Sequence, residues 1–106
     1  MNYVNLTGQD IKLLLPYEKY LELPRDEKYI TYTFTELTTI DDSGVITTNR
    51  TYKFNNIPEI KTDTIYIVDS IVKRYYMYRT DFAVVNNRIL DENNKYLFDN
   101  GIRFDK

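Results

Sequence analysis

Apolar and polar residues alternate along several short stretches of the chain, and this alternation is typical of β-strands. The clearest stretch is residues 29–37, where Ile30, Tyr32 and Phe34 alternate with threonines. A period of two places these apolar side chains on one face of a strand. Residues 41–44, Asp-Asp-Ser-Gly, then predict a turn, because Asp and Gly suit the backbone conformations of tight turns. The pattern therefore predicts a hairpin whose second strand follows this turn.

Residues 64–68, Thr-Ile-Tyr-Ile-Val, are the most apolar stretch and show no alternation. A strand of this kind is typical of the centre of a sheet, where both faces are covered. Asp69 or Ser70 follows and suits the position that caps the start of a helix. A helix over residues 70–79 would carry an apolar stripe made of Ile71, Val72, Tyr75 and Tyr78. Three cations lie off that stripe, namely Lys73, Arg74 and Arg79.

The other strands predicted by the pattern are short and end at turn residues. They are expected at residues 3–6, 11–15, 45–54, 82–85, 88–90, 95–98 and 102–104. Asn100-Gly101 is the strongest hairpin signal, because both residues tolerate a positive φ. Residues 17–28 contain Pro24 and match no element clearly. The sum predicts one α+β domain over residues 1–106, a mostly antiparallel β sheet of about six to eight short strands with one short helix near residues 70–79.

The amino-acid composition removes several classes of chemistry. The chain contains no Cys and no His, so disulfides, Cys-ligated zinc and triads of the Ser–His–Asp or Cys–His type are excluded. Carboxylates, Tyr and Lys remain as general acids or bases. The paired carboxylates Asp41-Asp42 and Asp91-Glu92 lie in predicted turns, where acidic side chains serve local hydrogen bonding. We therefore expect no enzyme activity, no metal site and no cofactor.

Charge and hydropathy bear on where the protein works and on what it binds. With 14 basic and 16 acidic residues, the formal net charge is −2. A binder of nucleic acid usually shows a basic patch, so double-stranded nucleic acid is not an expected partner. No apolar run approaches the ~20 residues that cross a bilayer, and the first residues show no signal peptide. The expected location is the cytoplasm, with no membrane partner.

Several short motifs resemble those of a family of small phage and prophage proteins. The motifs are Val4-Asn5-Leu6-Thr7 with Asp10-Ile11, Thr64-Ile-Tyr-Ile-Val68 with Ile71-Val72, Arg79-x-Asp81 and Asp91-Glu92. Members of that family typically open with Asn-Leu-Thr-Pro-His-x-Ile and carry Tyr-Ile-Val-Ser followed by Arg-x-Asp. The resemblance spans most of the chain. It implies a viral setting in the cytoplasm of a bacterial host and no particular activity.

The chain departs from the family pattern at three places. Gly8-Gln9 stands where the family usually has Pro-His, and Asp69 stands where it usually has Ser. Leu90 precedes Asp91, where the family often has Arg. If His or Ser performs chemistry in the family, this chain lacks that residue. A binding role is therefore expected here.

Residues 73–79, Lys-Arg-Tyr-Tyr-Met-Tyr-Arg, are the densest mixture of cationic and aromatic side chains. Arg and Lys hold phosphates, and Tyr rings stack on bases. The candidate ligand or partner site therefore consists of Lys73, Arg74, Tyr76, Arg79 and Asp81. Separately, the spacing of Arg79 and Asp81 would allow these two side chains to pair with each other. In the alternative interpretation, Tyr75 and Tyr78 pack the helix on the sheet while the cations stay solvated.

Tyrosine is unusually frequent, with eleven residues, and this residue type is enriched at protein interfaces. Five tyrosines are the hardest to bury in the predicted elements, namely Tyr17, Tyr20, Tyr29, Tyr76 and Tyr96. An exposed edge strand would also allow a second copy to pair, so a homodimer is possible. Both features favour a protein that works through its surface.

The leading hypothesis is a phage or prophage accessory protein that binds a host protein non-covalently. It would inhibit a host defence protein, as an anti-CRISPR-like inhibitor of a Cas-type nuclease does. One alternative is a sponge that sequesters a small nucleotide signal through Lys73, Arg74 and Arg79. Two further alternatives are a structural virion component and a metal-independent enzyme whose carboxylates converge in a cleft.

Overall fold

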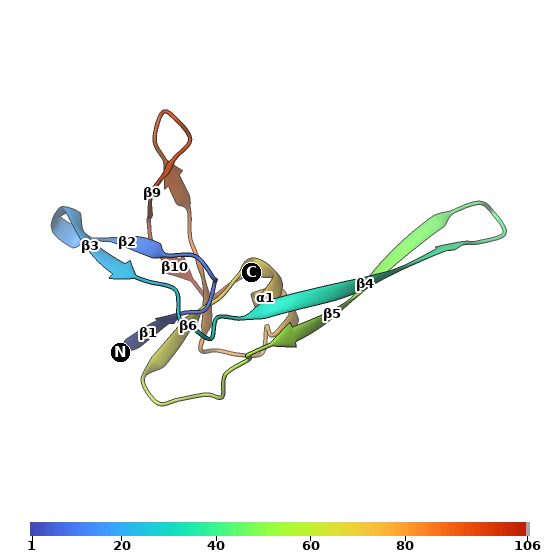
Figure 1. The fold of residues 1–106 in the computed structure, drawn as a ribbon, viewed down its shortest axis with the longest axis horizontal. Coiled ribbons are helices and arrows are strands. Elements are labelled where there is room, and N and C mark those ends of the chain that lie inside the picture. Colours follow the sequence, from blue (N-terminus) through green and yellow to red (C-terminus); the bar gives the residue numbers. More distant parts are fainter. Residues whose placement is uncertain (106) are drawn as a thin grey trace.

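A computed structural model describes residues 1–105 of the chain (Figure 1). Over these residues ten strands form three sheets, with one short α-helix and one turn of 3-10 helix between strands. The strands are β1 (Asn2–Asn5), β2 (Ile11–Leu15), β3 (Lys19–Leu23), β4 (Thr31–Ile40), β5 (Ile46–Asn55), β6 (Thr64–Ile67), β7 (Phe82–Val85), β8 (Arg88–Leu90), β9 (Tyr96–Asp99) and β10 (Ile102–Arg103). The helices are η1 (Pro16–Glu18) and α1 (Ser70–Tyr75). The predicted β-rich fold with one short helix is confirmed, although the strands are more numerous than expected.

The first sheet has the strand order β1-β6-β7-β10. β6 runs parallel to both β1 and β7, and α1 connects β6 to β7. β6 is central and covered on both faces, as its continuous apolar sequence predicts. Tyr66 and Val68 face one buried cluster, whereas Ile67 belongs to the other. The larger cluster consists of Leu6, Ile30, Tyr66, Val68, Val72, Phe82 and Val84.

The second sheet has the strand order β3-β2-β9-β8. β3 comes from the segment that matched no element clearly, and it forms a hairpin with β2. Tyr17 and Glu18 turn this hairpin with positive φ angles of 63° and 57°. β2 runs parallel to β9. The expectation of a mostly antiparallel sheet is therefore corrected to mixed sheets, because parallel neighbours are strands from distant parts of the chain.

Asn100-Gly101 does not form the hairpin turn that its sequence predicts. β9 pairs with β8 and β10 pairs with β7, so the two strands beside Asn100-Gly101 lie in different sheets. Between them, the Asn86 amide donates to the Gly101 carbonyl at 2.7 Å. Residues 82–103 therefore form one long hairpin that bends from the first sheet into the second, with its turn at residues 91–95.

Helix α1 begins where the sequence predicts but ends at Tyr75 instead of residue 79. Asp69 occupies the cap position, in an extended conformation. Tyr76 leaves helical geometry with φ −117° and ψ 40°. Its ring lies 5.6 Å from the ring of Phe54 and 6.1 Å from that of Phe82, centroid to centroid. The Tyr76 ring therefore packs between Phe54 and Phe82 at the point where the helix ends, and such aromatic contacts stabilise this conformation of the chain.

The hairpin of β4 and β5 forms a separate two-stranded sheet that projects from the rest of the protein (Figure 1). We call residues 31–55 the arm. Each of its strands has ten residues, and all ten are paired. The radius of gyration is 17.1 Å and the longest extent is 60 Å. A compact chain of this length would have a radius of about 13 Å, so the arm makes the molecule elongated.

Candidate functional site: the arm and its anchor

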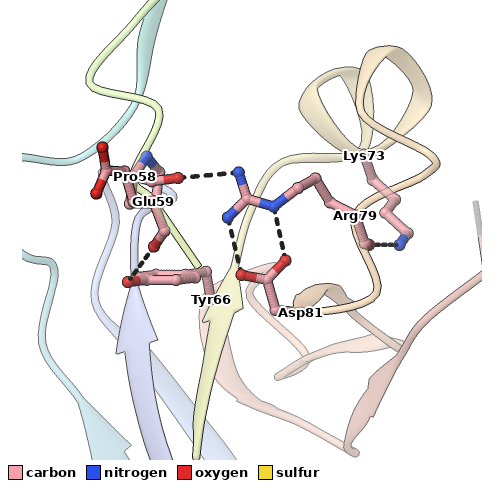
Figure 2. Close-up of polar contacts among 6 residues, drawn as sticks. All are labelled: Pro58, Glu59, Tyr66, Lys73, Arg79 and Asp81. Atoms are coloured by element: carbon pink, nitrogen blue, oxygen red, sulfur yellow. Dashed lines mark hydrogen bonds and ion pairs between the residues drawn. The ribbon is translucent and has the colours of Figure 1, made fainter. Parts of the chain in front are cut away.

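The residues that the sequence singled out lie beside the base of the arm, and three of the five are buried. Lys73, Arg79 and Asp81 are 3%, 7% and 7% exposed. Tyr76 is half-buried and Arg74 is exposed. Figure 2 shows Arg79 and Asp81 facing each other, with the Lys73 side chain directed at the Arg79 backbone. The structure therefore brings Lys73, Arg79 and Asp81 together inside the protein and not on its surface.

The Arg79 guanidinium makes three hydrogen bonds and one ring contact. It donates to both carboxylate oxygens of Asp81, at 2.8 Å each, and to the Pro58 carbonyl at 2.9 Å (Figure 2). Its central carbon lies 4.2 Å from the centroid of the Phe82 ring. The hydrogen bond between the two side chains lowers the pKa of Asp81 and raises the pKa of Arg79. Both groups are therefore charged at neutral pH, as a two-bond arginine–carboxylate pair requires.

Lys73 lies in α1, and its side chain bonds to the loop that follows this helix. Its Nζ donates to the Arg79 carbonyl at 2.9 Å, while its aliphatic stem is buried. The interpretation in which the cations stay solvated is therefore wrong for Lys73 and Arg79. Tyr78, expected to pack the helix, is instead 73% exposed, whereas Tyr75 is 47% exposed and its ring lies against Tyr52 and Phe54 of β5. The physical reason is the early end of α1, which takes Tyr78 out of helical phase and turns the chain inward at Tyr76.

The buried Arg79 pair ties this loop to the base of the arm. Pro58 and Glu59 lie in the connection that leads from β5 to β6. Besides the Arg79–Pro58 bond, the Tyr66 hydroxyl donates to the Glu59 carbonyl at 3.2 Å (Figure 2). The β5–β6 connection at the base of the arm is therefore hydrogen-bonded both to the loop before β7 and to the central strand β6.

Aromatic rings hold the inner part of the arm against α1. Tyr52 and Phe54 of β5 lie 5.0 Å and 5.4 Å from Tyr75, and Phe54 lies 5.6 Å from Tyr76, between ring centroids. These separations fall in the range where aromatic pairs stabilise each other beyond simple burial. We call Tyr52, Phe54, Tyr75, Tyr76 and the Arg79–Asp81 pair the anchor. The anchor fixes the direction of the arm.

The outer part of the arm, residues 35–51, is exposed at every position. On one face an ion pair joins Arg50 to Glu36 at 2.7 Å. Farther out on the same face, Ile40 lies opposite Ile46, and these residues are 67% and 65% exposed. Val45 follows the turn and is also exposed. We call Ile40, Val45 and Ile46 the apolar tip.

The edges of the arm are open as well as its faces. Within the part of the chain that the structure describes, β4 pairs only with β5. Each strand of a two-stranded ribbon leaves a row of backbone N–H and C=O groups on its outer edge, and such an edge is a template for another strand. An isolated ribbon is only marginally stable in water. The arm therefore combines an anchored base with an outer part, residues 35–51, whose backbone edges and side chains are free for contacts.

Two of the motifs noted in the sequence, around Asn5 and Arg79-x-Asp81, make buried hydrogen bonds within this fold. Asn5 is 2% exposed, and its side-chain amide donates to the Gln9 and Leu23 carbonyls at 2.6 Å and 2.8 Å. Arg79-x-Asp81 is the buried pair. Gly8 adopts φ +79°, which Pro cannot adopt.

Over residues 1–105, no helix is long and apolar enough to span a membrane. The same residues contain no cluster of three or more Asp, Glu, His or Cys side chains that could hold a metal ion. No family model matches the chain, and neither a curated protein nor a solved structure does. The geometry of the arm is therefore the observation that bears on function.

The sequence predicts the hairpin but not its projection from the protein. The sequence contains one signal for this projection, namely the polar composition of the hairpin face opposite Tyr32 and Phe34. That face carries Thr31, Thr33, Thr35, Thr39, Thr47, Asn49, Thr51, Lys53 and Asn55, with Leu37 as its apolar exception. A hairpin with one polar face and only a few aromatic pairs on the other has little to bury beyond its base.

Proposed function

We propose that this protein is a small phage or prophage accessory protein that binds a host protein non-covalently through the arm. The observation that carries the proposal is the arm itself, exposed at every position from 35 to 51 and anchored at its base. The viral setting rests on the motif resemblance. The function is inhibition of a host defence protein in the cytoplasm, in the manner of an anti-CRISPR inhibitor.

The chemistry of the arm favours a protein partner. An open ribbon edge binds an extended strand through backbone hydrogen bonds. The apolar tip adds side chains that contribute about 1.5–3 kcal/mol each when fully buried. The arm is close to neutral, since its charged residues are Glu36, Asp41, Asp42, Arg50 and Lys53. A near-neutral arm lacks the basic surface that phosphate recognition needs.

Inhibition requires only that the arm occupy a groove of the partner. A hairpin that reaches away from its domain enters a cleft that a compact domain cannot enter. Of the three cations in the segment 73–79, Arg74 alone is exposed. The geometry therefore does not favour that segment as the binding site of a nucleotide sponge.

One observation also favours the structural alternative. The open edges of β4 and β5 would equally accept a strand from a second copy. In that case the protein would self-assemble as a homodimer or as a virion component. Sedimentation at increasing protein concentration tests the virion alternative, because a virion component assembles into larger species as its concentration rises.

The test compares four tagged proteins in a bacterial host lysate. They are the wild type, a truncation in which Asn-Gly replaces residues 36–50, the tip variant Ile40→Asp with Ile46→Asp, and a control with Thr39→Asp and Thr47→Asp. The truncation retains the aromatic residues of the anchor. The control places the same charges beside the tip on the opposite face of the same ribbon. We expect the wild type and the control to capture the same host protein, with at least a ten-fold loss for the other two.

The biological readout is plaque formation on a host whose CRISPR immunity targets the test phage. Expression of the wild type should restore plaques, and expression of the truncation should not. Equal capture by the truncation would show that the arm is not the contact surface. Capture that depends on the arm without any effect on a defence system would reject inhibition of host defence.

A further inference from the structure

A cavity of about 290 Å³ lies where the two four-stranded sheets meet. Thr7, Asp69 and Val85 line it from positions at or just beyond the carboxyl ends of the parallel strands β1, β6 and β7. Arg88 and Asp99 line it from the second sheet. In open sheets with parallel strands, the crevice outside the carboxyl ends is the usual place for a ligand. The arm contributes none of the lining residues.

Asp99 is the unusual residue of this cavity. It is 1% exposed, and its Oδ2 accepts a hydrogen bond from the Tyr96 hydroxyl at 2.6 Å. Its Oδ1 is buried and receives no hydrogen bond from any group in residues 1–105. A buried oxygen without a donor is costly. Asp99 is therefore an acceptor that a bound molecule with an N–H or O–H group would satisfy.

The arginine opposite Asp99 does not provide this donor. Arg88 faces Asp99 in the strand register. Its terminal nitrogen donates instead to the Gln9 side chain at 2.8 Å, and its guanidinium lies 4.9 Å from the centroid of the Tyr96 ring. Arg88 is exposed. A second arginine, Arg103, also lines the cavity and is half-buried. Two guanidinium groups thus lie around the same space as the buried carboxylate.

The remaining lining is suited to a flat ring and a hydroxyl group. Ile11, Val68 and Val84 are 6%, 2% and 3% exposed and supply apolar walls. Asp69 and Ser70 lie at the start of α1. Burial raises the pKa of Asp69, so its carboxylate also gains from a donor. The cavity therefore offers two acceptors, apolar walls and two cations.

We propose that this cavity binds a nucleoside monophosphate, a function separate from that of the arm. The N–H groups of the base donate to Asp99, and the ring packs against Ile11, Val68 and Val84. The phosphate lies at Arg88 and Arg103, which provide charge-assisted hydrogen bonds. The ribose hydroxyls donate to Asp69. Guanosine monophosphate is the probe, because guanine presents two adjacent N–H donors to one carboxylate.

The experiment is calorimetric titration of the whole protein with guanosine monophosphate, guanosine, uridine monophosphate and inorganic phosphate. Asp99→Asn retains an oxygen for Tyr96 and replaces the free oxygen with an NH₂ donor. Arg88→Gln removes one cation near the phosphate. Arg25→Gln is the control, because Arg25 is an exposed arginine that does not line the cavity. Circular dichroism establishes that each variant is folded.

We expect guanosine monophosphate to bind more tightly than the other three compounds. Asp99→Asn should weaken this binding by about ten-fold or more, the usual effect of losing a hydrogen bond to a charged group. Arg88→Gln should weaken the nucleotide and leave guanosine unchanged. Arg25→Gln should bind as the wild type does. If Asp99→Asn does not fold, the binding of guanosine monophosphate and guanosine by Arg88→Gln still tests the proposed phosphate position.

Three results would overturn the proposal. No saturable binding of guanosine monophosphate up to about 1 mM would show that the cavity has no nucleotide affinity. Inorganic phosphate binding as tightly as the nucleotide would show that the arginines attract only an anion. Unchanged binding by folded Asp99→Asn would show that Asp99 does not contact the base. None of these results bears on the arm, which the capture assay tests separately.

Discussion

Replacement of Asp81 by Ala tests the anchor directly. Asp81 and Arg79 form a pair whose side chains are only 9% and 8% exposed, with N–O distances of 2.8 Å. The substitution removes the carboxylate and leaves the guanidinium buried beside the Phe82 ring. Water has little access to this position, so the charge is not resolvated. The folded state should therefore lose stability, while the unfolded state changes little.

The size of the loss follows from the contacts. Two hydrogen bonds to a charged group disappear, each contributing about 1.5–3 kcal/mol. Measurements on buried pairs give a cost of about 3–5 kcal/mol when one partner is removed. We expect a loss of about 3–5 kcal/mol, against a total stability of about 5–15 kcal/mol for a domain of this size. Asp81→Ala should therefore be among the most destabilising single substitutions in this protein.

The assay is urea unfolding followed by far-ultraviolet circular dichroism at 25 °C. Asp105→Ala is the matched control, because Arg103 and Asp105 have the same spacing in sequence but lie 3.5 Å apart, with the Asp105 side chain 80% exposed. That variant should lose less than about 1 kcal/mol. Arg79→Met combined with Asp81→Ala should lose less than Asp81→Ala alone, because no uncompensated charge stays buried.

Two outcomes would refute this reasoning. The first is a loss for Asp81→Ala no larger than that for Asp105→Ala, which would mean that Arg79 is solvated. The second is a double variant less stable than Asp81→Ala, which would mean that Arg79 acts without Asp81. Hydrogen exchange adds a local readout, since loss of the pair should speed exchange at the base of the arm.

Three further predictions concern single positions. Gly8→Ala should destabilise the protein by about 1–3 kcal/mol, because Gly8 has φ +79° and an added Cβ would lie 3.0 Å from the Tyr29 ring; an unchanged urea midpoint would contradict this. Replacing Tyr17-Glu18 by Asn-Gly should stabilise the protein by about 1–2 kcal/mol, since both residues have positive φ; thermal unfolding measures it, and a lower melting temperature would count against it. The third concerns pH. The hydrogen bond from Arg79 lowers the pKa of Asp81, so the stability from this pair is fully present above the unfolded-state pKa of about 3.9. It is lost as pH falls from there through the lower folded-state pKa, and urea midpoints at several pH values should show a smaller acid loss for Asp81→Asn than for the wild type.

Strand positions could be predicted because they depend on local pattern. The alternation of Ile30, Tyr32 and Phe34 with threonines sets which side chains share a face, and a pleated strand follows from that spacing alone. The turn after β4 follows from Asp41, whose carboxylate accepts from the Ser43 and Val45 amides at 2.8 Å and 3.0 Å. The continuous apolar sequence of β6 likewise requires cover on both faces.

Strand partners could not be predicted in this way. A period of two fixes a face but neither a neighbour nor a direction, so the parallel β1–β6, β6–β7 and β2–β9 pairs left no local signal. Asn100-Gly101 is a second case in which the local sequence does not specify the strand partners. Its residues suit a tight turn, yet Asn86-Asn87 lies opposite and continues the ladder. The turn forms at residues 91–95 because the long hairpin then pairs over its full length.

The candidate site was likewise predicted from the sequence only in part. The sequence alone determined that Lys73, Arg79 and Asp81 belong to an unusual segment, that Cys and His chemistry is absent, and that residues 29–54 contain a hairpin. Tertiary structure decided that the cations are buried, that the hairpin projects as an arm, and that Asp99 lies in a cavity without a donor. The physical reason is that burial depends on which distant segments pack together, and the residues near a position in sequence do not specify them.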